Sequence, residues 1–396
     1  MRQLLLLRAP AGAGKSTWIE EQNLKQYTLS ADDIRVMLGA VQYNNDGNFT
    51  IKQDYNSKVW KILFDMLEER MKIGATTIID ATHCKLSDIY KYNDLCRKYR
   101  YKLYVKEFST SETLCKKRNK ERPSYKQVPD EVIHNMFQSM VMQPLEYNND
   151  KYFILEEDQC FPVLKENMHD YINYKKIVAI GDIHGCIQPL HNYFINNPIK
   201  HDTLYVFMGD YFDRGKYNVG VFELLESFQQ TRDNFVFLIG NHDEHLINYV
   251  YKSGEVHDQT RETIRQFVKA NILKNRIKPF VDKLQPYFEF GGKFLFTHGG
   301  LVNGCIANYT DKEFVRGVGK YNDSHEVDES FTRRCEYFGM DFYSIHAHRN
   351  ILQEPIHNTD RTFNLCDTVE FGGNLRILEI DLESIDFKEI YIKNEI

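Results

Sequence analysis

The chain has 396 residues, 42% of them hydrophobic and 27% charged, a length sufficient for two domains with separate cores. Its formal net charge of -6 excludes a uniformly basic nucleic-acid surface, so any contact with nucleic acid has to be local. There is neither a long apolar run nor a secretory signal, and we expect a cytoplasmic protein without membrane contact. The eight cysteines form no C-x-x-C pair, which predicts free thiols rather than disulfides or a zinc knuckle.

The first part of the chain alternates strand and helix patterns. In chain order we expect a strand at Gln3–Leu7, helices from Lys15 and over 55–73, a strand at Thr76–Ile79, a helix over 86–99, a strand over 101–108, and helices over 112–120 and from Pro129. This order predicts a parallel sheet covered by helices. We place this domain at 1–155, followed by an acidic and polar linker at 156–173.

The second part, 174–396, contains a further set of apolar strands. They are expected at 176–180, 203–208, 234–239, 293–297, 375–380 and 387–392. A polar motif follows each of the first four. Because active sites of α/β proteins gather loops at the carboxyl ends of strands, this part is predicted to be an α/β sandwich with its site at that edge.

A glycine-rich loop, APAGAGKST, follows the first strand. Gly12 and Gly14 allow backbone N–H groups to turn toward phosphate oxygens, and Lys15 supplies a cation for the β- and γ-phosphates of ATP. Ser16, followed by Thr17, is the expected Mg²⁺ ligand. Alanine replaces the usual first glycine of G-x-x-x-x-G-K-[ST], and the alternative is a glycine-rich turn without function.

The segment ADDIR follows the position of the expected second strand. Asp32 could accept the proton of an attacking hydroxyl, and Arg35, three positions later on one helical turn, could hold a phosphate of the acceptor. The alternative is that Asp32 or Asp33 only caps the next helix.

Two further features accompany this loop. Asp80 closes an apolar strand and is expected near Mg²⁺ or its waters, whereas His83 is more often a packed or surface histidine than a catalytic one. The densest basic segment, KKRNKER, places Arg118 and Arg122 on one helical face. We interpret them as lid arginines that neutralise the transferring phosphoryl group, the alternative being a solvated charged face.

Residues 1–145 resemble the 5′-polynucleotide kinases of bacterial and phage nucleic-acid repair, in GKSTW, SADDIR, IIDATH, RNKER and VPDEVI. The resemblance implies that Lys15 and Ser16 bind ATP and Mg²⁺ and that Asp32 is the general base. It also implies that Arg35 binds the phosphate beside the acceptor hydroxyl. Histidine at position 83, where asparagine is common, departs from the pattern.

The motifs GDIHG, GDYFDRG and GNHD in the second part bring together metal-ligand side chains. Asp182 and His184 can point to one metal ion, Asp210 can bridge two, and imidazoles follow in THGG and SIHAH. Mixed nitrogen and oxygen ligands suit Mn²⁺, with Ni²⁺, Co²⁺ or Fe as rivals, and two such ions activate a shared water. Arg214 is placed to bind phosphate oxygens, and His242, oriented by Asp243, to protonate the leaving oxygen.

Residues 175–380 resemble the binuclear metallophosphoesterases, and GDIHGC and GNHD look like the phosphatase module of bacterial polynucleotide kinase-phosphatases. The resemblance implies a further site residue, Asp367, and six metal ligands: Asp182, His184, Asp210, Asn241, His298 and His346. Because IHA replaces the usual GHT, His348 remains a rival to His346.

The combined interpretation is a bifunctional enzyme that heals broken ends of RNA or DNA, with RNA the favoured substrate. It adds phosphate to a 5′-hydroxyl from ATP and removes a 3′-phosphate or 2′,3′-cyclic phosphate. Sealing then requires a separate ligase, and the number of subunits is left open. Rivals are a small-molecule or protein kinase fused to a protein Ser/Thr or dinucleoside polyphosphate phosphatase, and a non-catalytic RNA-binding regulator.

Overall fold

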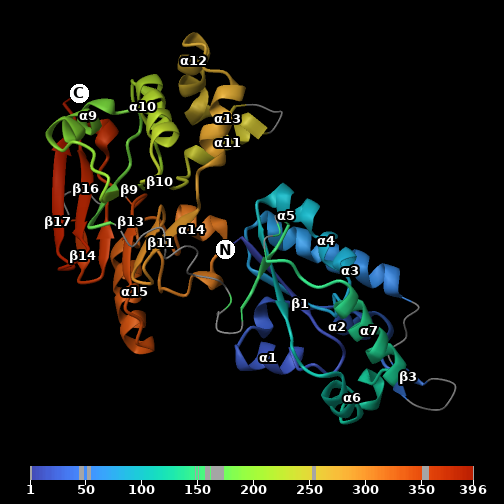
Figure 1. Cartoon of the computed structure of the whole chain (residues 1–396). Helices are drawn as coiled ribbons and strands as arrows, with labels where there is room; N and C mark the ends of the chain where they lie inside the picture. The colour runs from blue at the N-terminus through green and yellow to red at the C-terminus, as the bar shows by residue number, and fades with distance from the viewer. Residues whose placement is uncertain are drawn as a thin grey trace. The chain divides into compact units, whose positions relative to one another are not determined.

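The computed structural model describes residues 2–43, 49–50, 55–147, 149, 151–156, 161, 174–251, 256–349 and 356–395. The chain forms two compact units, 1–163 and 164–396 (Figure 1). Their division falls inside the predicted linker, of which residues 157–160 and 162–173 lie outside the described residues. In the part of the chain described, we find no helix with the length and apolar character needed to cross a membrane.

The N-terminal unit contains the predicted parallel sheet. Its strands, in spatial order, are β2 (Thr28–Ser30), β5 (Thr77–Asp80), β1 (Gln3–Arg8), β6 (Lys102–Glu107) and β7 (Phe153–Ile154). The side chains of β1 alternate between two cores. Leu4 and Leu6 pack in the core that includes α3, whereas Leu5 and Leu7 pack with Ile19 of α1 on the other face.

The helices of this unit are α1 (Lys15–Glu21), α2 (Ala31–Gly39), α3 (Asn56–Lys72), α4 (Leu86–Tyr90), α5 (Asn93–Tyr99), α6 (Glu112–Lys120) and α7 (Asp130–Met142), with a short β3–β4 pair at Gln42–Tyr43 and Phe49–Thr50. The helix expected over 86–99 is interrupted between α4 and α5. There the buried Tyr92 ring packs in the core, and its hydroxyl lies 3.0 Å from Nε2 of His83. Tertiary packing thus outweighs helix propensity at this turn.

The C-terminal unit contains two five-stranded sheets. One has the order β10 (Phe235–Phe237), β9 (Thr203–Phe207), β8 (Lys176–Ile180), β16 (Asn374–Asp381) and β17 (Phe387–Lys393). The other has the order β11 (Tyr287–Phe290), β12 (Phe294–Thr297), β13 (Tyr343–His346), β15 (Thr362–Asn364) and β14 (His357–Thr359). The strands β11, β13, β14 and β15 were not predicted, since they are short and several are interrupted by polar residues.

The two sheets pack face to face, as an α/β sandwich requires. Ile177 and Ala179 of β8 belong to the core that also contains residues of β12, whereas Val178 and Ile180 face the helix-side core. That core includes residues of α9 (Ile187–Asn196), α10 (Asn218–Thr231), α11 (Asp243–Tyr251), α12 (Arg261–Lys269) and α13 (Lys274–Asp282). In Figure 1, α11, α12 and α13 lie together, whereas α9 lies apart from them near the C-terminus. On the second sheet, α15 (Ser324–Phe338) contacts β14 and β15, and α14 (Asp311–Arg316) precedes it.

Candidate active sites of the two units

The glycine-rich loop of the N-terminal unit connects β1 to α1. Gly12 and Gly14 have φ angles of 81° and 100°, a left-handed conformation that residues with a Cβ rarely adopt. A Cβ at Gly12 would also lie 2.4 Å from the backbone oxygen of Cys115. The two glycines therefore fix the path of the loop, and Ser16 and Thr17 lie exposed at the start of α1.

Lys15 folds back across this loop. Its Nζ donates to the carbonyl oxygens of Ala9 and Pro10 at 3.2 and 3.0 Å. Burial lowers the pKa of Lys15, against the attraction of Asp80. Burial also raises the pKa of Asp80, and here the charge of Lys15 opposes it. The lysine and the carboxylate at the end of β5 therefore act within one site, which fits phosphate oxygens and a Mg²⁺ ion.

The Asp32–Arg35 pair lies at the start of α2. Asp32 Oδ1 accepts from Arg35 Nη1 at 2.8 Å, and Arg35 Nη2 donates to Asn56 Oδ1 at 2.5 Å. The helix is capped by Ser30, whose hydroxyl accepts from the N–H of Asp33 at 3.3 Å. The capping alternative for Asp32 and Asp33 is therefore wrong. Asp32 also contributes to the electrostatic environment of Lys15.

The predicted lid arginines lie near the loop. A Cβ at Gly14 would be 3.5 Å from Arg118 Nη1, and the charge of Arg122 contributes to lowering the pKa of Lys15. His83 is packed inside the unit, with Nδ1 3.0 Å from the carbonyl oxygen of Leu7, and burial lowers its pKa to about 4. Arg118 and Arg122 therefore lie close to the loop, and their contact with donor phosphates stays a prediction, whereas His83 is a packed histidine.

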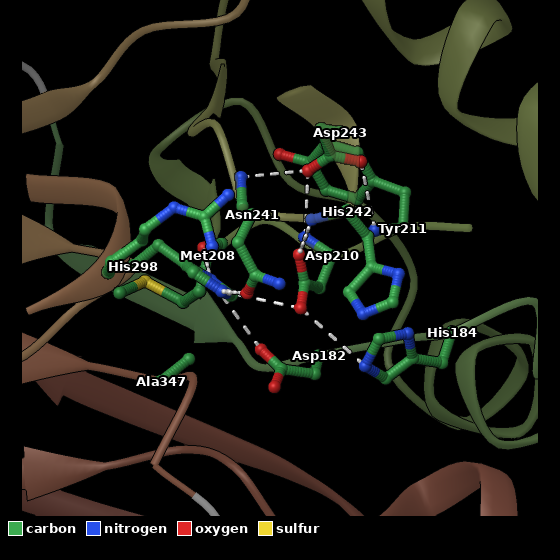
Figure 2. A network of polar contacts seen from close by, with 12 residues as sticks. Asp182, His184, Met208, Asp210, Tyr211, Asn241, His242, Asp243, His298 and Ala347 are labelled. Atoms are coloured by element: carbon green, nitrogen blue, oxygen red, sulfur yellow. Dashed lines mark hydrogen bonds and ion pairs between the residues drawn. The ribbon is translucent and has the colours of Figure 1, made fainter. Parts of the chain in front are cut away.

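Four predicted metal-binding side chains of the C-terminal unit gather around the carboxylate of a fifth, Asp210 (Figure 2). Asp210 Oδ2 lies 3.6 Å from His184 Nε2 and 3.4 Å from His298 Nε2. His298 Nε2 is 3.3 Å from Asn241 Oδ1, and His298 Nδ1 is 3.7 Å from Asp182 Oδ1. The loops after β8, β9, β10 and β12 supply these residues, as the sequence predicts.

Backbone carbonyl groups orient the two imidazoles. His184 Nδ1 lies 3.1 Å from the carbonyl oxygen of Phe212, so a proton on Nδ1 leaves Nε2 free to bind a metal. His298 Nδ1 lies 2.8 Å from the carbonyl oxygen of Met208. Although burial disfavours both charges, the attraction between His298 and Asp210 raises the pKa of His298 to about 9 and holds the pKa of Asp210 well below its usual range.

The donor set fits two divalent metal ions. Asp210, His298 and His348 supply one group of ligand atoms. Asp210 and His184 belong to a second group, in which a ring nitrogen of His242, the predicted proton donor, also lies, so Asp210 is shared. Asp182 Oδ1 is buried, and among the described residues it has no hydrogen-bond partner, which leaves it available to a cation. Burial raises the pKa of Asp182, the charge of His298 opposes this effect and the nearby charge of Asp210 adds to it.

His242 is oriented by a carboxylate other than the predicted one. Its Nδ1 lies 2.8 Å from Asp213 Oδ2, and Asp213 also accepts from the hydroxyls of Thr260 and Thr263 at 2.8 and 2.6 Å. Asp243 instead accepts from backbone N–H groups, including that of Asp210 at 2.8 Å. The prediction for Asp243 was therefore wrong, since its carboxylate holds the loop rather than the imidazole.

Arg214 lies at the cavity with its guanidinium already paired. Its Nη1 donates to Glu370 Oε1 at 2.7 Å and lies 3.3 Å from His184 Nε2. The arginine side chain is 39% exposed and that of Glu370 only 2%, so the carboxylate is the buried support of the pair. Arg214 therefore lies beside the metal-ligand cluster, and its contact with phosphate oxygens stays a prediction.

The structure places His348, and not His346, in the metal-ligand cluster. His346 is fully buried, and its Nε2 lies 3.0 Å from Asp328 Oδ1, while Asn358 donates to the other carboxylate oxygen at 2.6 Å. The ring centroid of His348 is 5.1 Å from that of His298, and burial lowers the pKa of His348 to about 3, so the imidazole is neutral. The choice of His346 is corrected on this geometry.

Asp367 also lies away from the cluster. Its Oδ2 accepts from the amide nitrogen of the Asn374 side chain at 2.7 Å and lies 3.6 Å from Arg376 Nε. The preceding residue, Cys366, lines the cavity together with Asp182 instead. Asp367 thus supports the loop that carries Cys366, which corrects its prediction as a site residue.

The cluster opens into a cavity of about 230 Å³. Its lining combines predicted residues with some that the sequence did not indicate: Asp182, His184, Asp210, Arg214, Asn241, His242, Gln259, Tyr321, His348, Cys366, Thr368 and Glu370. Asp213 could have been found within GDYFDRG, whereas no pattern marks Gln259, Tyr321 or Glu370.

Two family models match the two units. Residues 4–143 match the AAA domain, and residues 175–358 match the calcineurin-like phosphoesterase. The chain is a P-loop, kinase-like domain fused to a calcineurin-like metallophosphoesterase domain. In this P-loop–phosphoesterase fusion, the match to the calcineurin-like phosphoesterase lies in the C-terminal unit, which also contains the metal-ligand cluster.

Individual relatives of this fusion resemble parts of it. A serine/threonine-protein phosphatase of Caenorhabditis elegans is 31% identical over 130 residues, which are 31% of this chain and about a quarter (26%) of that protein. Among solved structures, a Saccharomyces cerevisiae protein serine/threonine phosphatase has a TM-score of 0.40 at 16% identity and covers 56% of this chain and 80% of its own. A cold-active protein-tyrosine phosphatase of a Shewanella species has a TM-score of 0.37 at 16% identity, with coverage of 55% and 80%.

Proposed function

We propose that the chain heals the ends of broken RNA strands. The N-terminal unit transfers the γ-phosphate of ATP to a 5′-hydroxyl, with Mg²⁺. The C-terminal unit removes a 3′-phosphate or 2′,3′-cyclic phosphate with Mn²⁺ or a similar divalent ion, in the cytoplasm. A separate ligase then seals ends prepared in this way.

The observation that carries the proposal is the Asp32–Arg35 ion pair beside the loop of Lys15. The side chain of Asp32 is 50% exposed, so an incoming hydroxyl can reach its carboxylate. The guanidinium of Arg35 donates to Asp32 and Asn56, and it would exchange one of these partners for a phosphate near that hydroxyl. A polynucleotide 5′ end offers a hydroxyl with a phosphate close to it.

The C-terminal cavity supplies the opposite chemistry. Divalent ions held by the carboxylate and imidazole cluster would act as Lewis acids and activate water. Arg214 binds the phosphate oxygens. His242 gives a proton to the oxygen of the leaving group, and Asp213 stabilises the imidazole ring in the required orientation.

A protein phosphatase is the second candidate for the C-terminal unit, because the match to the Caenorhabditis elegans serine/threonine-protein phosphatase favours it. The N-terminal unit would then be a kinase for a protein or a small molecule. A protein or small-molecule kinase does not require an arginine that binds a phosphate next to the acceptor hydroxyl. The Asp32–Arg35 pair therefore distinguishes the RNA end-healing enzyme from the second candidate.

A competition assay tests the proposal. The protein, with Mn²⁺, receives equal concentrations of a 3′-phosphorylated RNA oligonucleotide, a phosphothreonine peptide and a dinucleoside tetraphosphate, and a 5′-hydroxyl RNA is supplied with labelled ATP and Mg²⁺. We expect release of the RNA phosphate and labelling of the RNA. Preference for the peptide, without RNA labelling, would establish the second candidate instead.

A further inference from the structure

Tyr321 stands at the mouth of the phosphoesterase cavity. It lines the cavity together with His348, and its side chain is 46% exposed. The two ring centroids are 5.2 Å apart and the rings are nearly perpendicular, at 89°. The edge of one ring thus faces the other. An aromatic side chain therefore combines exposure to solvent with contact to the metal-ligand cluster.

The loop that carries Tyr321 is built around a buried arginine. Arg349 is fully buried, and its guanidinium donates to the carbonyl oxygens of Lys320 at 2.5 Å and Tyr321 at 3.4 Å, and also to that of Val318. Because burying a charge is costly unless it is hydrogen-bonded, these carbonyl groups and the arginine fix one another.

Backbone conformation supports the same arrangement. Gly317 and Gly319 have φ angles of 75° and 76°. A Cβ at Gly317 would lie 2.5 Å from Arg349 Nη2, so the loop can approach the guanidinium only with glycine there. Arg349 directly follows His348 in the sequence, and it therefore ties the position of Tyr321 to that of the cluster.

We propose that Tyr321 is a stacking platform for the nucleobase of the nucleotide that carries the scissile phosphate, and that Arg349 is its positioning residue. This inference rests on the proposed function, since it requires a nucleotide substrate. With the phosphate at Arg214 and the metal-ligand cluster, the group attached to it extends toward the cavity mouth, where Tyr321 is exposed. Stacking on an aromatic ring tolerates any base sequence, which suits an enzyme that acts on random breaks.

The test compares a substrate that has a base with one that lacks any ring. Values of kcat/KM are measured for adenosine 3′-phosphate and for glycerol 2-phosphate with the Mn²⁺-loaded full chain. Because base stacking is worth about 1–3 kcal/mol, we expect Tyr321→Ala and Tyr321→Leu to lower the ratio of the two values by about 10-fold, through KM. Tyr321→Phe keeps the ring and is expected to retain the ratio.

Tyr337 provides a matched control, because it is an 83% exposed tyrosine on α15 that does not line the cavity. Its replacement by alanine is expected to leave the ratio unchanged. Equal losses on both substrates in Tyr321→Ala, or leucine performing as well as phenylalanine, would overturn the stacking role alone. A wild-type protein that hydrolyses a phosphopeptide but neither adenosine 3′-phosphate nor a 3′-phosphorylated RNA overturns both the stacking role and the proposed function.

Discussion

The two sites differ in the atoms that they present to phosphate. Around the N-terminal loop the side chains are mainly cationic donors, with Lys15, Arg118 and Arg122 gathered near two glycines. The C-terminal cluster presents acceptors, namely carboxylate oxygens and imidazole nitrogens around Asp210. Donors can bind phosphate oxygens directly, whereas acceptors need a cation between them and the phosphate. The N-terminal site thus presents donors that suit phosphate oxygens, and the C-terminal site presents ligands that suit metal ions.

They also differ in how far the site is prepared before the substrate binds. Lys15 donates to two carbonyl groups of its own loop, and in the proposed kinase reaction it would exchange them for phosphate oxygens. In the C-terminal unit, backbone carbonyl groups and Asp213 already orient His184, His298 and His242. The metal site is therefore preorganised by its surroundings, while the loop reorganises at its lysine.

The largest expected effect separates the two units. Asp210→Asn removes charge from the carboxylate shared by both ligand groups, and we expect phosphate release to fall by about 10³-fold, which corresponds to several kcal/mol of lost metal assistance. Transfer of phosphate from ATP to a 5′-hydroxyl RNA, measured on the same preparation, should stay near the wild-type rate. Parallel loss of both activities would contradict two independent sites.

Lys15→Ala is expected to have the opposite selectivity from Asp210→Asn, because it affects phosphate transfer from ATP and not phosphate release. Loss of the cation at the loop is expected to lower RNA labelling from ATP by about 10²-fold or more, and to leave release of a 3′-phosphate unaltered. Lys25→Ala is the matched control, because Lys25 is an exposed lysine of the same unit that pairs with Asp33. A similar decrease in both lysine variants would show that general charge, rather than the loop lysine, matters.

Substitutions of His348 and His346 test which of the two histidines binds the metal ion. His348→Asn is expected to weaken Mn²⁺ binding by about 10- to 100-fold in a calorimetric titration, because it removes a ligand of the Asp210 cluster. His346→Asn breaks a buried contact with Asp328, so it should lower the thermal unfolding temperature and leave Mn²⁺ affinity nearly intact. The reverse pattern would restore His346 as the ligand.

The sequence alone could not distinguish His348 from His346 as the metal ligand, and the reason is physical. Residues two apart on a strand face the same side, so both histidines of SIHAH could point to the metal ions. However, β13 ends at His346, and His348 has a φ angle of 63°, which breaks the alternation. Only the three-dimensional structure shows which ring turns toward Asp210.

Other parts of the molecule were predictable because local patterns specify them. The parallel sheet of the N-terminal unit follows from strands that alternate with helices, and the cluster of Asp182, Asp210 and His298 follows from motifs at the ends of strands. The partners Glu370 and Tyr321 were missed, because they approach the site from loops distant in sequence and carry no motif. Tertiary contacts alone bring such residues to the cavity.

The smallest expected effect concerns stability of the N-terminal unit. The pKa of His83 is lowered by burial from 6.5 to about 4, so the unfolded chain binds a proton more readily and stability is lost as the pH falls from 6.5 toward 4. Between pH 6.5 and about 4.5, protonation of this group should lower the free energy of unfolding by about 2 kcal/mol. His83→Asn should remove this dependence of the free energy of unfolding on pH. Both tryptophans, Trp18 and Trp60, lie in this unit, so urea unfolding followed by their fluorescence reports it. An unchanged slope in the variant would assign the acid sensitivity to other groups.

The most direct test of the central claim uses one RNA oligonucleotide with a 5′-hydroxyl and a 3′-phosphate. The protein is incubated with it, labelled ATP, Mg²⁺ and Mn²⁺, and the groups at both ends of the product are identified. Two separate phosphate sites predict an RNA labelled at the 5′ end that has a 3′-hydroxyl, with Lys15→Ala losing only the first change and Asp210→Asn only the second. An RNA recovered with both ends unaltered, from a preparation that dephosphorylates a phosphothreonine peptide, would contradict the account.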